Sequence, residues 1–271
     1  MVKKLIKHEM LFYLRTLLPA ELILLGMALL VRFVQFFESD AVIYDIVAIS
    51  SIVTYVIAII VCVVMMFITG LTRFYKNLYT AEGYLSFTLP VTHSGHIFSK
   101  LFSAVAVSLI TALVIGVSLA IATAGEVFSE IVKAGNYLFK MLFDYTGVHG
   151  VLFIIEFIVL VIVSLSTGYL LYYTCITAGQ MAKKNRVLAA FGIYFGYYFV
   201  CQTIGTFFMI MTAIFNEPIA RLMENIGLFA ETHPIATVHI FFISVIIFDA
   251  IIGGVYYFLT HLIMKKRLNL E

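Results

Sequence analysis

Three carboxylates stand inside long apolar runs of the sequence, at Glu21, Glu156 and Asp249. A carboxylate at the centre of a membrane span costs about 2.5–3.5 kcal/mol, so each of the three requires a partner or a function. The functional interpretation is a polar translocation path or an ion relay. The structural interpretation is a buried, hydrogen-bonded pair that fixes helix packing, for which Arg32 is a candidate partner of Glu156. The residue types alone leave both interpretations open.

The other reactive residue types form no catalytic or metal-binding pattern. His93 and His96 have the H-x-x-H spacing, but a helical metal site needs further ligands, so no metal is expected. Cys62, Cys175 and Cys201 all fall in apolar runs, where cysteine packs as a small apolar residue. The sequence has no G-x-x-x-x-G-K-[ST], H-E-x-x-H or G-x-S-x-G motif. We therefore expect a chain that is not an enzyme on its own and carries no cofactor.

The composition places these residues in a membrane protein. Of the 271 residues, 63% are hydrophobic and only 12% are charged, against about 25% charged in a soluble domain. A helical span needs about 20 apolar residues. Six runs are long enough: Leu17–Phe36, Tyr44–Gly70, Phe98–Ala124, Val151–Ala178, Val187–Phe215 and Ile235–Ile263. Because backbone groups in lipid must be satisfied within the segment, we expect an all-α membrane protein with a single transmembrane domain over residues 1–271.

Lysine and arginine are distributed unequally between the two sides of a six-span topology. Of these 17 residues, 13 fall at the termini, Arg267 included, or in the even-numbered connections. The positive-inside rule therefore predicts that both termini are cytoplasmic. Acidic residues, Glu38 and Asp40 among them, show the reverse bias. The net charge of +2 is too small to indicate a nucleic-acid partner.

The N-terminal residues 1–16 have the spacing of an amphipathic helix. Apolar residues recur on one face, while Lys3, Lys4 and Lys7 lie on the opposite face. This pattern predicts an elbow helix that lies on the inner membrane surface. Pro19 would then occupy the first turn of the first span. The alternative is a basic flank that only obeys the orientation rule.

Two external connections also have amphipathic spacing. Residues 126–146 predict a helix on the outer surface before the fourth span. Residues 216–233 predict a short helix before the sixth span, with Asn216 as its cap and Gly227 at its end. This second element either lies on the outer surface or re-enters the membrane.

The connection between the second and third spans, residues 71–95, predicts a short helix beneath the membrane. The apolar residues of its first half recur at helical spacing. Pro90 stops the helix and disfavours a helical conformation at Leu89. Thr92 or Ser94 can cap the third span. An ordinary interfacial linker is the alternative interpretation.

One stretch of this connection carries a dense motif. It consists of Tyr79, Glu82, Gly83, Tyr84 and Leu85, then Thr88–Leu89–Pro90–Val91–Thr92, then Ser99–Lys100. These residues resemble the first coupling helix of ABC-2-type permeases. That family commonly has an acidic residue with Gly, a turn with Leu and Thr, T-L-P-V-S/T, and S/G-K at the next span. The resemblance extends to the elbow helix and the six-span architecture.

The resemblance implies the permease subunit of an ATP-driven exporter in the bacterial cell membrane. Two copies of the chain would form the translocation path, and two copies of a separate ATPase subunit would bind ATP and Mg. The ATPase would dock on the cytoplasmic side through Tyr79, Glu82, Gly83, Tyr84, Phe87 and Pro90. The cargo would be an amphipathic peptide, such as a phenol-soluble modulin, or a hydrophobic compound. The alternative is an ion-coupled secondary transporter that uses Asp249, Glu156 and Glu21.

Overall fold

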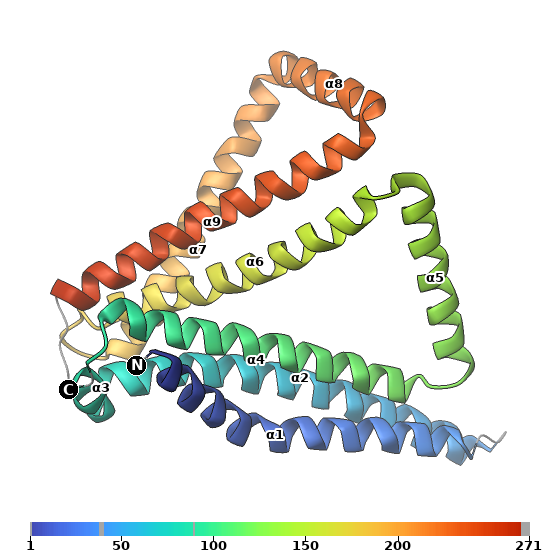
Figure 1. The fold of residues 1–271 in the computed structure, drawn as a ribbon, viewed down its shortest axis with the longest axis horizontal. Coiled ribbons are helices and arrows are strands. Elements are labelled where there is room, and N and C mark those ends of the chain that lie inside the picture. The colour runs from blue at the N-terminus through green and yellow to red at the C-terminus, as the bar shows by residue number, and fades with distance from the viewer. Residues whose placement is uncertain (1, 38–40, 89, 267–271) are drawn as a thin grey trace. The chain divides into compact units, whose positions relative to one another are not determined.

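The computed structural model describes residues 2–37, 41–88 and 90–266. Within these ranges the chain forms nine helices and no strand, which confirms the all-α prediction (Figure 1). The helices are α1 Val2–Gln35, α2 Val42–Tyr79, α3 Ala81–Thr88, α4 His93–Ala122, α5 Glu126–Thr146, α6 His149–Gly179, α7 Arg186–Ile214, α8 Asn216–Thr232 and α9 Pro234–Lys266. The expectations for Glu38, Asp40, Leu89 and Arg267 lie outside the described residues.

Six of these helices are long and apolar enough to cross a membrane: α1, α2, α4, α6, α7 and α9. Each of the six apolar runs expected from the sequence lies almost entirely within one of these helices. Six such helices indicate a multi-pass membrane protein.

The N-terminal segment is not a separate helix. Residues 2–16 and the first apolar run form one continuous helix, α1, and Pro19 lies inside it rather than in its first turn. The physical reason is a single buried stripe that continues past the proline, formed by Glu9, Tyr13, Leu17, Leu24, Ala28 and Val31. Figure 1 shows α1 bending partway along, as helices that contain proline commonly do.

The second long helix, α2, also continues further than its apolar run predicts. It ends at Tyr79, so Leu71–Tyr79 belongs to α2 and not to the short helix that follows. Thr80 is extended, with φ −112° and ψ −169°, and separates α2 from the eight-residue α3. The α3 helix ends at Thr88, two residues before Pro90, as the missing amide of proline predicts.

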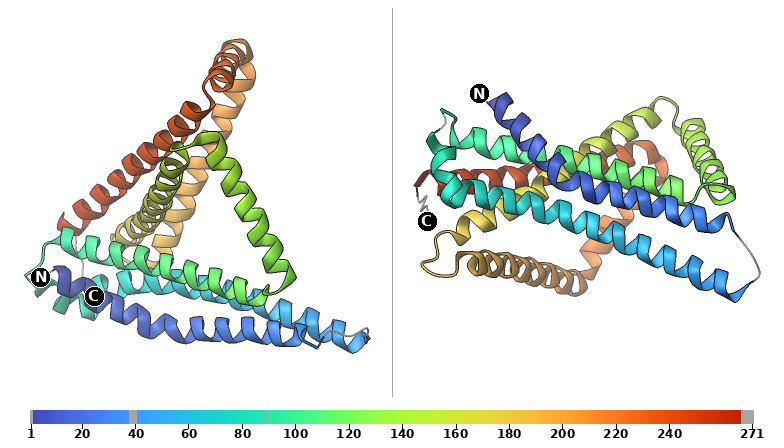
Figure 2. Two further views of the ribbon diagram at one scale, coloured as in Figure 1. Left: turned by 45° about the vertical axis from the view of Figure 1, so that its right-hand side comes forward. Right: turned by 90° about the horizontal axis from the view of Figure 1, so that it is seen from below.

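The helices form two compact units, Met1–Met141 and Leu142–Glu271. In the first unit α4 packs against α1 and α2, and the three helices lie side by side (Figure 2). The buried face of α4 is rich in small residues, among them Ser103, Ala104, Ser108 and Ser118, which let helices approach closely in a membrane. The hydroxyl groups of Tyr55 and Ser118 lie 2.8 Å apart and join α2 to α4.

The α4 helix begins where its cap predicts. The hydroxyl oxygen of Thr92 accepts a 3.2 Å hydrogen bond from the amide of Gly95, so Thr92 is the N-cap. The helix starts at His93, slightly before the apolar run that predicted the third span.

In the second unit α6 packs along α9 and also contacts α7. The helical segment expected over residues 126–146 is present as α5. The segment before the last span is also a helix, α8, but two details differ from the prediction. Asn216 is its first residue and makes no cap, and the helix continues through Gly227 to Thr232. Glycine lowers helix propensity by only about 1 kcal/mol, so flanking residues can override it.

Candidate functional site

A buried charge network joins the four helices at one end of the first unit. Its centre is Glu9 of α1, whose side chain is 2% exposed. One carboxylate oxygen accepts a 2.9 Å hydrogen bond from Nζ of Lys100 on α4. The other accepts a 2.9 Å hydrogen bond from Nε of Arg73 on α2. One acid therefore ties the start of α1 to both α2 and α4.

The same network continues to the short helix α3. Lys100 Nζ also donates to the side-chain oxygen of Asn77 at 2.7 Å. The amide nitrogen of Asn77 lies 3.4 Å from a carboxylate oxygen of Glu82. Arg73 lies 3.5 Å from the same oxygen, and its guanidinium lies over the ring of Phe12 at 4.2 Å. Glu82, at the start of α3, is thus connected to Lys100 in α4 through α2.

The charges of this network balance. Glu9 and Glu82 carry two negative charges, and Arg73 and Lys100 carry two positive charges. The Lys100 side chain is 1% exposed, and burial of an unpaired ammonium would cost several kcal/mol. Its hydrogen bonds to Glu9 and Asn77 offset that cost. The arrangement can hold α3 in a fixed position relative to α1, α2 and α4.

The predicted docking residues divide into buried and exposed groups. Tyr79 is 1% exposed and its ring packs 5.9 Å from that of Phe74, so it faces the inside of the first unit. Gly83 is buried, and its amide donates to the carbonyl of Thr80 at 2.7 Å. Only the exposed residues of α3 and its flank can meet a partner.

Phe87 is half-buried and packs against the first turn of α4. Its ring centroid lies 5.5 Å from that of His93 and 5.6 Å from that of His96. Both histidines therefore pack against Phe87. Among the residues that the structure describes, no group of three or more His, Cys, Asp or Glu side chains could hold a metal ion.

The exposed face of α3 consists of Glu82, Tyr84 and Leu85, followed by Pro90. Tyr84 is 56% exposed and Leu85 is 73% exposed, and the Glu82 side chain is 55% exposed. A large aromatic, an apolar side chain and a carboxylate on one short helix form a surface of the kind that anchors protein partners. We refer to Glu82, Tyr84 and Leu85 as the α3 face.

Sequence reasoning missed the centre of the network. Glu9 and Lys100 are 91 residues apart, and no local pattern pairs them. A signal was nevertheless present. Glu9 lies in the apolar stripe of residues 1–16, three residues after Ile6 and four before Tyr13, and Lys100 stands at the start of an apolar run. Two opposite charges at positions expected to be buried indicate a pair.

The intramembrane carboxylate Glu21 lies in the first unit. Its oxygen Oε1 accepts a 2.8 Å hydrogen bond from the hydroxyl of Thr111, which joins α1 to α4. Together with the Glu9–Lys100 pair, this contact shows that α1 and α4 run parallel, because the separation in sequence stays at 90 to 91 residues. Glu21 has a neutral partner and no basic one among the described residues.

Glu156 and Asp249 lie in the second unit, between α6 and α9. Glu156 Oε1 lies 2.7 Å from Nδ1 of His239, so this histidine is its partner within the second unit. Arg32 lies 3.5 Å from the side-chain oxygen of Gln35. The hydroxyl of Ser164 donates to the carboxylate of Asp249. These contacts give each acid a hydrogen-bonded partner on the neighbouring helix, as the structural interpretation predicts.

Comparison with known proteins adds no relative: no protein-family model matches the chain, and no curated protein or solved structure matches it.

Proposed function

We propose that this chain is the membrane-spanning permease subunit of an ATP-driven ABC exporter of the ABC-2 type. Two copies form the translocation path, and two separate ATPase subunits dock on the cytoplasmic side. The cargo is an amphipathic peptide or a hydrophobic compound. The chain lies in the bacterial cell membrane with both termini in the cytoplasm.

The observation that carries this proposal is the α3 helix with its motif. Eight residues form a helix between two long apolar helices, and the sequence over Tyr79–Thr92 resembles that of coupling helices. Glu82 of α3 is bonded into the charge network, while Tyr84 and Leu85 are exposed. A helix that is fixed on one side and exposed on the other is suited to receive a force from a partner and to pass it to α4.

The orientation in this proposal rests on charge. Most of the basic residues lie on the side of the termini and of α3, and this side is the cytoplasmic one under the positive-inside rule. The α3 face would therefore meet soluble ATPase subunits. The sequence contains no phosphate-binding loop, which supports the proposal that ATP is hydrolysed by a separate subunit.

The experiment is to co-purify the tagged chain with a candidate ATPase subunit and to measure Mg-dependent ATP hydrolysis. The chain alone should show none. Tyr84→Ala should reduce complex formation, because loss of a well-packed anchor costs about 2 kcal/mol or about thirtyfold in affinity. Leu113→Ala is the matched control, since Leu113 is 71% exposed on α4 but lies far along the helix from α3. ATP hydrolysis by the purified chain, or normal assembly of Tyr84→Ala, would contradict the proposal.

Ion-coupled secondary transport is the second candidate. It is favoured by one observation: Glu21, Glu156 and Asp249 lie in apolar helices and no described Lys or Arg pairs with them. Transport by proteoliposomes that contain the chain alone, driven by an ion gradient without ATP, would select this candidate. An absolute requirement for ATP and a second subunit would reject it.

A further inference from the structure

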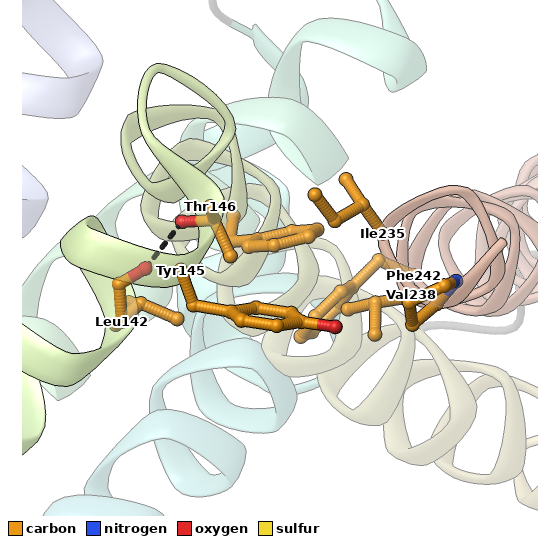
Figure 3. Close-up of a pocket in the computed structure, with 8 residues that line it drawn as sticks. Leu142, Tyr145, Thr146, Ile235, Val238 and Phe242 are labelled. Atoms are coloured by element: carbon orange, nitrogen blue, oxygen red, sulfur yellow. Dashed lines mark hydrogen bonds between the residues drawn. The ribbon is translucent and has the colours of Figure 1, made fainter. Parts of the chain in front are cut away.

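The second unit contains an apolar cavity of about 370 Å³. The side chains around it come from the end of α5, the start of α6 and the start of α9 (Figure 3). Phe153, Val238 and Phe242 contribute apolar walls. The hydroxyl of Thr146 is turned to the carbonyl of Leu142, to which it donates at 2.6 Å, so it is not free for a ligand. The volume lies in the range of small-molecule sites, about 300–1,000 Å³.

A polar cluster adjoins this cavity. His239 follows Val238 in α9, and its ring centroid lies 4.3 Å from that of Phe153, which lines the cavity. His239 Nδ1 lies 2.7 Å from Glu156 Oε1, and His239 Nε2 lies 3.1 Å from His149 Nδ1. Because a carboxylate only accepts, Nδ1 of His239 donates to Glu156, and His239 bridges Glu156 and His149.

The Glu156 carboxylate has an unused acceptor. Its second oxygen, Oε2, is buried and accepts no hydrogen bond from any described residue. A buried carboxylate oxygen without a donor is unfavourable, and hydrogen bonds from charged donors to carboxylates are the strong ones, so Oε2 favours a cationic hydrogen-bond donor.

We propose that this end of α6 and α9 binds an amphiphile with an apolar body and a positively charged amine. The apolar body occupies the cavity, and the ammonium group donates to Oε2 of Glu156. The Glu156 side chain is 17% exposed, and its partner His239 contacts Phe153 in the cavity wall. The site rests on the proposed export function, for which it names the cargo class: cationic amphiphiles rather than neutral or anionic ones.

The test uses the full chain in lipid nanodiscs and two fluorescent probes. Dansylcadaverine has an apolar ring system and a primary ammonium, and its N-acetyl derivative has the same ring system without the charge. Anisotropy titrations are corrected with empty nanodiscs for partition into lipid. We expect dansylcadaverine to bind about tenfold or more tightly than the acetylated probe, because hydrogen bonds to charged groups are strong. Equal affinities, or no binding above that of empty nanodiscs, would overturn the proposal.

Two variants separate the charge from the cavity. Glu156→Gln should reduce the affinity of dansylcadaverine to that of the acetylated probe and leave the acetylated probe unchanged. Val238→Phe should fill the cavity and weaken both probes. The controls are Glu224→Gln, an exposed acid in α8, and Val255→Phe on α9, which does not line the cavity. Unchanged binding in both Glu156→Gln and Val238→Phe would refute the site.

This test is independent of the ATPase. Probe binding needs only this chain, whereas the proposed export function fails if no ATPase subunit assembles with it. Selective binding of dansylcadaverine without any ATPase partner would keep the site and reject the ABC assignment. An assembled complex that hydrolyses ATP but shows no selective binding of dansylcadaverine would keep the ABC assignment and reject the site.

Discussion

Glu9 and Lys100 form a buried ion pair between the N-terminal halves of α1 and α4, with 2.9 Å between the carboxylate oxygen and Nζ. Their side chains are 2% and 1% exposed. The buried face of α1 is otherwise apolar, whereas that of α4 also carries small polar residues. The pair is completed by Arg73 and Asn77 of α2, and through Glu82 it reaches α3.

The variant Glu9→Gln should be strongly destabilised. It removes the negative charge beside Lys100 and leaves one amide oxygen for two cationic donors, Lys100 and Arg73. Removal of one partner of a buried ion pair costs about 3–5 kcal/mol. The measurement is thermal unfolding of the detergent-purified chain followed by circular dichroism. Glu217→Gln is the control, because the Glu217–Arg221 pair at 4.0 Å is almost fully exposed. An equal effect of the two substitutions would contradict the buried network.

The double variant Glu9→Met/Lys100→Met should be more stable than either single variant. It removes both buried charges and replaces them with flexible apolar side chains, while Arg73 keeps its contact with Glu82. The same unfolding measurement gives a coupling energy for the pair. Additive losses in the double variant would show that the two groups do not interact.

Gly179→Ala should lower stability, and Gly192→Ala should not. A Cβ at Gly179 would lie 2.7 Å from the backbone nitrogen of Ala190, whereas a Cβ at Gly192 meets nothing within 4 Å. Alanine in the interior of α7 gains about 1 kcal/mol in helix propensity, so Gly192→Ala should be neutral or stabilising. The midpoints of thermal unfolding distinguish the two. A Gly179→Ala midpoint at or above that of wild type would refute the close contact of α6 with α7.

Loss of the α4 cap should have a moderate effect. Thr92→Ala removes the acceptor of the Gly95 amide and should cost about 1 kcal/mol. Thr88→Ala is the control, because the Thr88 hydroxyl bonds the Leu85 carbonyl on the exposed side of α3 and caps nothing. Unfolding midpoints compared in one detergent provide the test, and Thr88→Ala should stay within error of wild type.

The topology can be tested with single cysteines. In a background without Cys62, Cys175 and Cys201, a cysteine at Ser129 should react with a membrane-impermeant maleimide on intact cells. A cysteine at Lys184 should react only after permeabilisation, since the basic side of the chain is expected to be cytoplasmic. Lys184 is preferred to Asn185, whose φ of +55° a cysteine tolerates poorly. The reverse labelling pattern would invert the proposed orientation.

Local signals in the sequence predicted the helices well. Apolar runs of sufficient length gave all six long helices, Thr92 gave a cap, and Pro90 gave the end of α3, because each depends on a few neighbouring residues. Predictions failed where packing overrides a local preference. Pro19 and Gly227 both lie inside helices that continue past them.

The candidate site was predicted less completely, because residues that meet in it lie far apart in the sequence. The motif spans the residues of α3. The side chains of Tyr84 and Glu82 are exposed, as expected. Tyr79 was expected to be exposed as well, but it is buried and packs on Phe74. Similarly, His239 lies 83 residues from Glu156, and only the packing of α6 on α9 brings the two side chains together. Pairings of this kind depend on how helices meet, which no window of sequence contains.

The length of α2 determines how far α3 lies from the end of the apolar run of α2. The helix runs nine residues beyond the apolar run that ends at Gly70, to Tyr79, and at 1.5 Å per residue this overhang measures roughly 13 Å. Headgroups occupy only about 5–8 Å on each side of the hydrocarbon. In the proposed orientation the α3 face would then stand beyond the headgroups in water, where a soluble partner would reach it by diffusion. Rising ionic strength should then slow any encounter that Glu82 steers, while the apolar contacts of Tyr84 and Leu85 keep their strength.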